Sequence, residues 1–220
     1  MSCEPTENLL LVIDSATAAC SAALIGPDGA VRAERHEIVG RGHAERLVPM
    51  IADLLDDRRP TAILVDCGPG SFTGVRVGLA AAHGLAIGWG VPLAGFSSLA
   101  LLAASAGESE VGVAVTGGHG ELFVQSYGGD PLQPLGALRS LAPVEAAAAI
   151  EAELVVGSGA EALVVARGHG RFLDASPRAA DVRLLPEPLR SLPPRPIYGR
   201  APDARPVQSD AAGGIEGPMR

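Results

Sequence analysis

The residues best suited to chemistry form one glycine-rich run, Gly68-Pro69-Gly70-Ser71-Phe72-Thr73-Gly74, between an expected strand and an expected helix. A turn of this kind can direct backbone N–H groups and a helix N-terminus toward an anion. Its spacing differs from the dinucleotide fingerprint, because three residues instead of two separate Gly70 from Gly74. It also differs from a nucleophile elbow, because the glycine before Ser71 is one residue too close. The run therefore predicts either a purely structural tight turn or an anion contact.

The basic residues exclude two kinds of site, because all 17 of them are arginine. A P-loop needs a lysine that reaches the outer phosphates, and Schiff-base catalysis needs a lysine amine. The formal net charge of -8 also argues against a free-standing nucleic-acid binder. Such a protein needs a basic surface that displaces counterions from phosphates.

The cysteines and histidines predict neither a disulfide framework nor a metal site. The three cysteines, Cys3, Cys20 and Cys67, are widely spaced and form no C-x-x-C pair. The residue four positions after His43 is Leu47, so no pair of histidines shares a face of that expected helix. We interpret the other histidines as structural or solvent-facing, namely His36, His83, His119 and His169.

The sequence predicts a reduced, cytoplasmic protein with no membrane segment. The N-terminal residues are acidic and lack the basic region of a signal peptide. Residues 77–107 carry no formal charge and exceed the length of a membrane span. Because Pro92 and five glycines interrupt this stretch, we expect a buried helix, a short strand and another helix there.

Apolar patterns predict alternating strands and helices. The continuous apolar run over 9–13 is typical of a central strand that is covered on both faces. Apolar residues at three- and four-residue intervals predict a helix over His43–Asp57. The first part of the chain is expected to follow the order β-β-β-α-β-α-β-α, with strands over 9–13, 20–25, 30–37, 62–65 and 91–94 and helices over 43–57, 75–88 and 97–106.

A second, smaller unit is expected after Gly107. It holds strands over 111–115, 122–127 and 154–156 and helices over 143–152 and 160–166. We expect an N-terminal subdomain over 1–107, a C-terminal subdomain over 108–200 and a flexible tail over 201–220. The last forty-odd residues are rich in proline, so we expect them to wrap the surface or fray.

Five segments carry a resemblance to a known family. They are LVIDSATAACS over 11–21, GHAERLVPMI over 42–51, GPGSFTGVRVG over 68–78, VPLAGFSSL over 91–99 and PIYGRAPDARP over 196–206. In this order they resemble the TsaB (YeaZ) family, the dimerisation subunits of tRNA threonylcarbamoyladenosine biosynthesis. The match is dense from Leu9 to about Gly107 and scattered afterwards. One departure is Thr116-Gly117-Gly118, where family members commonly carry Asp-Ala-Arg.

The resemblance implies an α/β protein with the actin-like ATPase (ASKHA) fold, built from two related subdomains. It places a phosphate loop at Asp14, Ser15 and Thr17, with Asp14 as a magnesium-directed carboxylate. Members of this subunit type are regarded as having lost catalysis, so we favour a vestigial loop in which Asp14 caps the turn. The catalytic paralogue holds its metal with paired histidines after its equivalent of Val91-Pro92, and this chain has none there.

The resemblance also implies partners for a non-catalytic scaffold subunit. These are a TsaD-like catalytic paralogue that it binds and activates, a TsaE-like ATPase subunit, a second copy of the chain when alone, and tRNA only indirectly. No tightly bound cofactor is expected, but ATP or ADP is a candidate ligand at the subunit junction. Its contacts would come from the glycine-rich run, through Gly68, Gly70, Ser71, Thr73 and Gly74.

Two helices are the expected partner interface, because small residues let helix axes approach closely. Paired with two equivalent helices of the paralogue, they would complete a four-helix bundle. The interface residues that we predict are His43, Leu47, Met50, Ile51, Leu54, Arg76, Leu79, Ala80 and His83. The alternative is that both helices only cover the sheet of their own chain.

Two other functions remain open at this stage. A small-molecule kinase or ATPase of the same fold would need a complete second phosphate loop, which does not stand out after Val111. A glycoprotease-like peptidase would need a metal pair or an activated nucleophile. Neither Ser71 nor Cys67 has an evident base nearby in the sequence.

Overall fold

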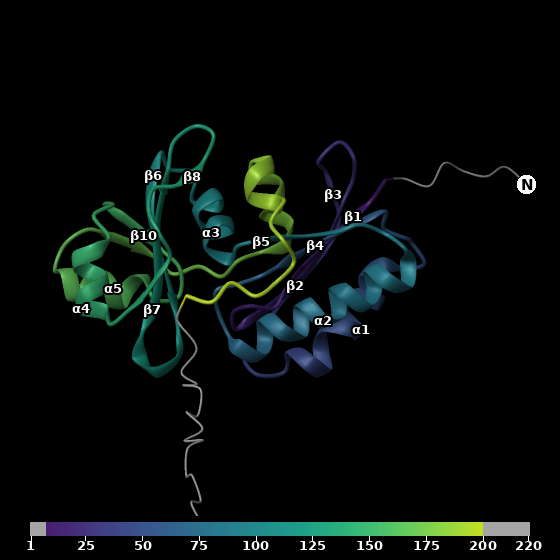
Figure 1. The fold of residues 1–220 in the computed structure, drawn as a ribbon, viewed down its shortest axis with the longest axis horizontal. Helices are drawn as coiled ribbons and strands as arrows, with labels where there is room; N and C mark the ends of the chain where they lie inside the picture. Colours follow the sequence, from purple (N-terminus) through teal and green to yellow (C-terminus); the bar gives the residue numbers. More distant parts are fainter. Residues whose placement is uncertain (1–7, 200–220) are drawn as a thin grey trace, which may run out of the picture.

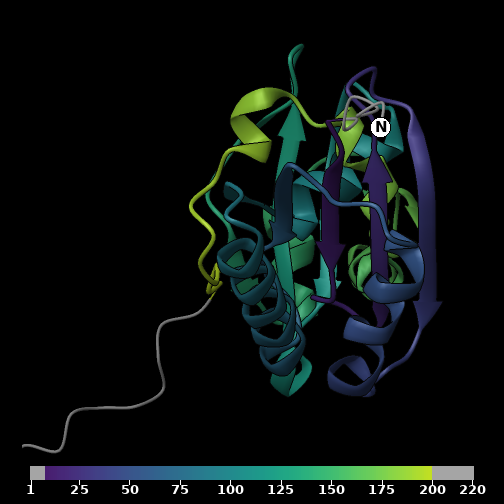
Figure 2. The same ribbon diagram turned by 90° about the vertical axis from the view of Figure 1, so that its right-hand side faces the viewer.

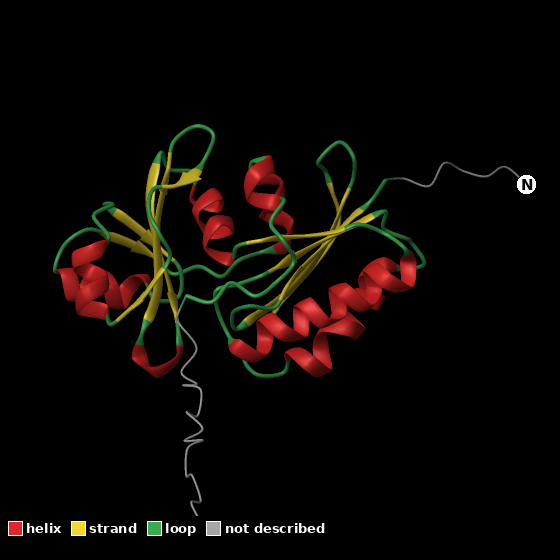
Figure 3. Ribbon diagram, in the orientation of Figure 1, coloured by secondary structure: helices red, strands yellow, loops and turns green. Residues whose placement is uncertain are grey.

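Two β-sheets stand side by side in the computed structural model, which describes residues 8–199 (Figures 1 and 3). Cys3 and the expected tail over 201–220 lie outside the described residues. Helices pack against both sheets, and further helical segments lie between them (Figure 1). Each sheet therefore has two faces that helices or other segments must cover.

The first sheet has five strands in the order β3-β2-β1-β4-β5. Their bounds are Leu10–Asp14 (β1), Ala19–Ile25 (β2), Val31–Ile38 (β3), Ala62–Asp66 (β4) and Leu93–Phe96 (β5). Strands β1, β2 and β3 are antiparallel, whereas β4 and β5 run parallel to β1. Every residue of β2 and all but one of β1 are buried, as expected of strands with both faces covered.

Three helices cover the first sheet: His43–Leu55 (α1), Phe72–Trp89 (α2) and Ser98–Ala106 (α3). Helices α1 and α2 lie together on one face, and α3 lies on the other face, between the sheets (Figure 1). Helix α2 begins where Ser71 Oγ accepts a hydrogen bond from Gly74 N at 3.2 Å. It ends at Gly90, whose φ of 68° favours glycine.

The second sheet repeats the strand order of the first. Its strands are Glu110–Thr116 (β6), Leu122–Gly128 (β7), Gln133–Pro134 (β8), Arg139–Leu141 (β9), Leu154–Val156 (β10) and Arg171–Leu173 (β11). The order is β11-β10-β6-β7-β8, with β7 and β8 antiparallel and β10 and β11 parallel to their neighbours. The two sheets thus share one topology, which makes the two halves of the chain related.

Two helices cover the far face of the second sheet, Pro143–Ala149 (α4) and Ala160–Arg167 (α5) (Figure 1). Three short 3-10 helices complete the described chain: Gly118–Gly120 (η1), Ala179–Leu184 (η2) and Glu187–Arg190 (η3). The β-β-β-α-β-α-β-α order predicted for the first part is confirmed. The sequence did not predict the short strands β8, β9 and β11, because a strand of two or three residues is too short to show an alternating apolar pattern.

The C-terminal segment departs from the expectation that it would only wrap the surface or fray. The side chains of Ala179, Val182 and Leu185 are buried in one core with α3 and the central strands of both sheets. The 3-10 helix η2 packs against β2 and α3. It covers the part of the first sheet that the short helix α3 leaves open, so burial of apolar area holds it in place.

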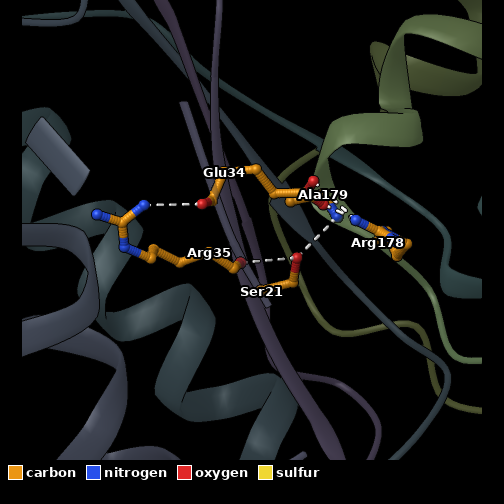
Figure 4. A network of polar contacts seen from close by, with 5 residues as sticks. All are labelled: Ser21, Glu34, Arg35, Arg178 and Ala179. Atoms are coloured by element: carbon orange, nitrogen blue, oxygen red, sulfur yellow. Dashed lines mark hydrogen bonds and ion pairs between the residues drawn. The ribbon is translucent and has the colours of Figure 1, made fainter. Parts of the chain in front are cut away.

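Polar contacts fix the start of η2 on the first sheet (Figure 4). Ser21 Oγ accepts a hydrogen bond from Ala179 N at 3.0 Å and donates one to Arg35 O at 3.3 Å. Beside it, the Arg178 guanidinium donates to both carboxylate oxygens of Glu34, at 3.1 and 2.8 Å. The ion pair is partly exposed and contributes little, but the Ser21 contact is buried.

Replacement of Ser21 by alanine is expected to destabilise the chain by roughly 1–3 kcal/mol, because the buried Ala179 N–H loses its acceptor. Urea-induced unfolding measures the change. Ser105→Ala is the control, since Ser105 is exposed and its hydroxyl donates to the carbonyl of Leu102 in the same helix. Equal unfolding midpoints for Ser21→Ala and the unaltered chain would contradict an anchoring role for Ser21.

Candidate binding cleft and helix surface

The glycine-rich run forms a tight turn after β4. Gly68 has a φ of +89°, its peptide bond to Pro69 is cis, and its N–H donates to Asp66 Oδ1 at 2.7 Å. Ser71 N then donates to Ala16 O at 2.6 Å. The run is therefore held on two sides, by the end of β4 and by the turn between β1 and β2.

Glycine is required in the run because its backbone touches that neighbouring turn. A Cβ atom on Gly70 would lie 2.0 Å from Ala16 O, and one on Gly74 would lie 2.1 Å from Ser15 O. Ser15 Oγ also donates to Gly74 O at 2.9 Å. These contacts give the run a structural role that does not depend on a ligand.

The predicted phosphate loop lies beneath the glycine-rich run. Asp14 and Ser15 are buried, at 0% and 2% exposure, and Thr17 is half-buried. Asp14 Oδ1 accepts a hydrogen bond from Ala16 N at 3.1 Å, and Thr17 Oγ1 accepts one from Ala19 N at 3.2 Å. This is the geometry of a turn cap, and it leaves Asp14 and Ser15 no open face toward a phosphate.

Two buried carboxyl groups meet at the ends of the parallel strands β1 and β4. Burial, and then the charge of Asp66, raise the pKa of Asp14 well above its ordinary value. Burial also raises the pKa of Asp66 to about 6, although hydrogen bonds from Ser98 Oγ and Gly68 N oppose that shift. Asp14 Oδ2 has no hydrogen-bond partner within the described chain. Like charges so close favour one shared proton.

The remaining residues predicted for the glycine-rich site are scattered. Gly68 and Gly74 are buried, Gly70 is half-buried, and Ser71 and Thr73 are exposed. Only Gly70 and Ser71 of this set line an open space. The structure thus separates the glycines that pack the turn from the residues that face solvent.

The partner interface predicted on α1 needs a correction. The side chains of five predicted residues are buried against the sheet of their own chain, namely His43, Leu47, Met50, Ile51 and Leu54. His43 Nε2 lies 3.2 Å from Ala19 O. Leu79 on α2 is also buried, at 6% exposure. An amphipathic helix turns its apolar side toward its own core first, so these six side chains cannot reach a partner in this conformation.

The exposed sides of α1 and α2 carry a different set of residues, which we call the outer helix surface. It consists of the exposed apolar or small residues Ala44, Val48, Ala52, Ala80, Gly84, Ile87 and Gly88. Glu45, Pro49, Asp53 and His83 are exposed on the same two helices. Val48 is 58% exposed and Ile87 is 83% exposed. The two helices contact each other on one face of the sheet (Figures 1 and 2). Of the predicted interface residues, Ala80 and His83 are exposed and Arg76 is half-buried.

A cavity of about 690 Å³ lies between the two halves of the chain, and we call it the cleft. One wall is the start of α2, and the other is the turn between β6 and β7. The segment 196–199 closes one side. Phe72 and Tyr198, which sequence reasoning did not assign, line the cleft while 69% and 57% exposed. The signal available in the sequence was a phenylalanine within the glycine-rich run.

No group of three metal-ligating side chains comes together within the described residues. No helix in the same part of the chain is long and apolar enough to cross a membrane.

The shared strand order of the two sheets, with helices on their faces, defines an actin-like ATPase (ASKHA) fold. A family model described as TsaD, tRNA N6-adenosine threonylcarbamoyltransferase, matches residues 35–168. The TsaB protein of Escherichia coli is 39% identical over 127 residues, which cover 54% of each chain. The TsaB protein of Haemophilus influenzae is 39% identical over 107 residues, or 45% of this chain and 43% of that one.

A solved structure extends the likeness to most of the chain. A Pseudomonas aeruginosa protein described by its similarity to peptidase YEAZ has a TM-score of 0.73 and 29% identity, and covers 88% of this chain and 100% of its own. The chain belongs to the TsaB (YeaZ) family. It spans about half the length of the curated relatives that it matches.

Proposed function

We propose that this chain is an accessory subunit of tRNA threonylcarbamoyladenosine biosynthesis that binds and activates a TsaD-like catalytic paralogue. The outer helix surface carries the proposal, because two adjacent helices expose Val48, Ile87 and a row of small residues. Membership of the TsaB (YeaZ) family supports the pathway.

The physical case for docking rests on residue size. Alanine and glycine at Ala44, Ala52, Ala80, Gly84 and Gly88 keep the surface low, so helices of a partner can approach closely. Val48 and Ile87 then supply the apolar area that association removes from water. Two helices from each protein would form a four-helix bundle. A second copy of the chain would occupy the same surface, more weakly, when the paralogue is absent.

The remaining partners follow from the same role. A TsaE-like ATPase would join the pair, with ATP or ADP at the subunit junction, in the cytoplasm. The net charge of -8 supports indirect contact with tRNA, through the catalytic partner. The covered Asp14 and Ser15 support a subunit that leaves catalysis to that partner.

Neither alternative function gains support from the site. An ATPase of this fold would need Asp14 open to a metal and a phosphate, but the glycine-rich run covers it. A cysteine peptidase would need a reactive thiolate. Burial raises the pKa of the Cys67 thiol to about 12, which keeps the sulfur protonated.

The test pairs the chain with the catalytic paralogue of the same organism in sedimentation velocity. The double variant Val48→Glu/Ile87→Glu is expected to weaken the complex by about 100-fold or more, because association would bury two unpaired carboxylates. Leu47→Glu is unsuitable, since Leu47 is fully buried and a charge there would unfold the chain.

The matched control is Val165→Glu, which makes the same change from an apolar to an acidic residue at a position that is 71% exposed. Val165 lies on α5, which covers the second sheet. This variant should leave the complex intact. Retention of the complex by the double variant, with unchanged thermal unfolding, would overturn the proposed surface. If the unaltered chain forms no complex with the paralogue, the proposed function itself is wrong.

A further inference from the structure

The end of the described chain runs back from the second sheet to the first. After β11, residues 174–199 form η2, η3 and an irregular stretch, and we call them the return segment. The 3-10 helix η2 packs on β1, β2 and β3 of the first sheet and on α3, whereas α3 packs on β6, β7 and β10 of the second sheet. In Figure 1 the yellow-green ribbon of the return segment lies between α3 and the first sheet. The return segment is therefore part of the layer that joins the two halves of the chain.

That joining layer is one apolar core. Val12 on β1, Val113 on β6 and Leu185 at the end of η2 belong to a single cluster of buried side chains, and each is at most 3% exposed. All five residues over Leu99–Ala103 of α3 are buried, so this helix is covered on every side. Two domains are expected to move relative to each other unless the interface between them is large and apolar. Here a swing of one half against the other would expose the shared core to water.

Backbone contacts hold the later part of the return segment on both halves. Leu192 and Gly95 on β5 exchange two backbone hydrogen bonds, at 2.7 and 3.0 Å, so the segment extends the edge of the first sheet. Its last residue lies against the second half, because a Cβ atom on Gly199 would be 2.6 Å from Cδ1 of Phe123 on β7. The return segment thus leaves β11, crosses the first half and comes back to β7.

We propose that the return segment is a clamp that locks the two halves in one orientation. Hinged proteins close when a few loop or element-terminal residues absorb a large change in backbone angles. Within residues 8–199, the chain connections between the halves run through α3 and η2, and side chains of both elements are buried in the shared core. The clamp makes the chain a rigid platform. It requires neither a ligand nor a partner, so it stands apart from the proposed docking.

The experiment measures the distance between the halves in the full chain by double electron–electron resonance. Spin labels are attached through Glu45→Cys on α1 and Glu161→Cys on α5, two exposed positions on different halves. Cys3→Ser removes a competing thiol, and Cys20 and Cys67 stay unlabelled because they are buried. A clamped chain is expected to give one narrow distance distribution. A broad or two-component distribution would show that the halves swing, and the proposal would be wrong.

The double variant Val182→Ala/Leu185→Ala is expected to broaden the distribution at least twofold, because it removes the apolar side chains that hold η2 in the core. The matched control is Arg183→Ala/Leu184→Ala, since these two neighbouring side chains are exposed. Circular dichroism establishes that each variant is folded. If the double variant is unfolded, Ser21→Ala takes its place, because Ser21 fixes the start of η2. Equal widths for the core variant and its control would rule out the return segment as the clamp.

Discussion

Gly74→Ala is expected to lower the free energy of unfolding by about 3 kcal/mol or more, even though alanine is the better helix former. The new Cβ atom would lie 2.1 Å from Ser15 O, a backbone atom that no side-chain rotation can move away. Relief requires α2 and the turn between β1 and β2 to separate, which also weakens the bond from Ser15 Oγ to Gly74 O.

The control is Gly84→Ala in the same helix. A Cβ atom there meets nothing within 4 Å, so the change should raise the free energy of unfolding by roughly 0.5–1 kcal/mol. Chemical denaturation of both variants measures the contrast. Gly70→Ala should behave like Gly74→Ala, since its Cβ atom would lie 2.0 Å from Ala16 O. Equal stability of Gly74→Ala and Gly84→Ala would refute the close-packing role of the run.

Much of the order of strands and helices was accessible from the sequence, because several elements have a strong period or a continuous apolar run. The strand over 9–13 and the helix from His43 are examples, and the structure has both. The burial of η2 was not accessible. Ala179, Val182 and Leu185 follow no long period, and their core exists only once the sheet and α3 are in place.

The sequence also did not show which residues of α1 and α2 form the exposed surface. An apolar stripe on a helix indicates that one side of the helix is buried, but it does not show whether the same chain or a partner protein buries it. The stripe through Leu47 and Met50 covers the sheet of its own chain. The weaker row at Ala44, Val48 and Ala52 was visible at four-residue spacing, but only the structure shows that it stays exposed.

The pairing of Asp14 with Asp66 is an intermediate case. Both apolar strands, LLVID and AILVD, end in aspartate, so each carboxyl group could be placed at a strand end. The parallel register of β1 and β4 then brings the two ends together. A single sequence does not show which distant strands pair with each other.

Asp14→Asn is expected to stabilise the chain at pH 7–8. In the folded protein both carboxyl groups keep a proton to higher pH than in the unfolded chain, where the pKa of aspartate is about 3.9. Between about pH 4 and pH 6 the folded state therefore binds more protons, and the free energy of unfolding falls as pH rises through this window. The stability that is lost in this pH window is not regained at higher pH.

An asparagine removes the second charge and retains the useful contact. Its Oδ1 can accept from Ala16 N as Asp14 does, and its amide N–H can donate to the Asp66 carboxylate. Relief of a buried, unpartnered oxygen is worth roughly 1–3 kcal/mol, or about 2–12 °C in Tm for a chain of this size. At pH 4 the gain should shrink, because Asp14 then holds its proton.

Thermal unfolding of Asp14→Asn across pH 4–8 measures both the gain and its slope. Asp57→Asn is the control, since Asp57 is exposed after α1 and asparagine tolerates its φ of 64°. A Tm for Asp14→Asn that equals or falls below that of the unaltered chain at pH 8 would mean that Asp14 contributes a favourable charge. That outcome would revive the interpretation of Asp14 as a carboxylate kept for a ligand, against the covered geometry of the strand end.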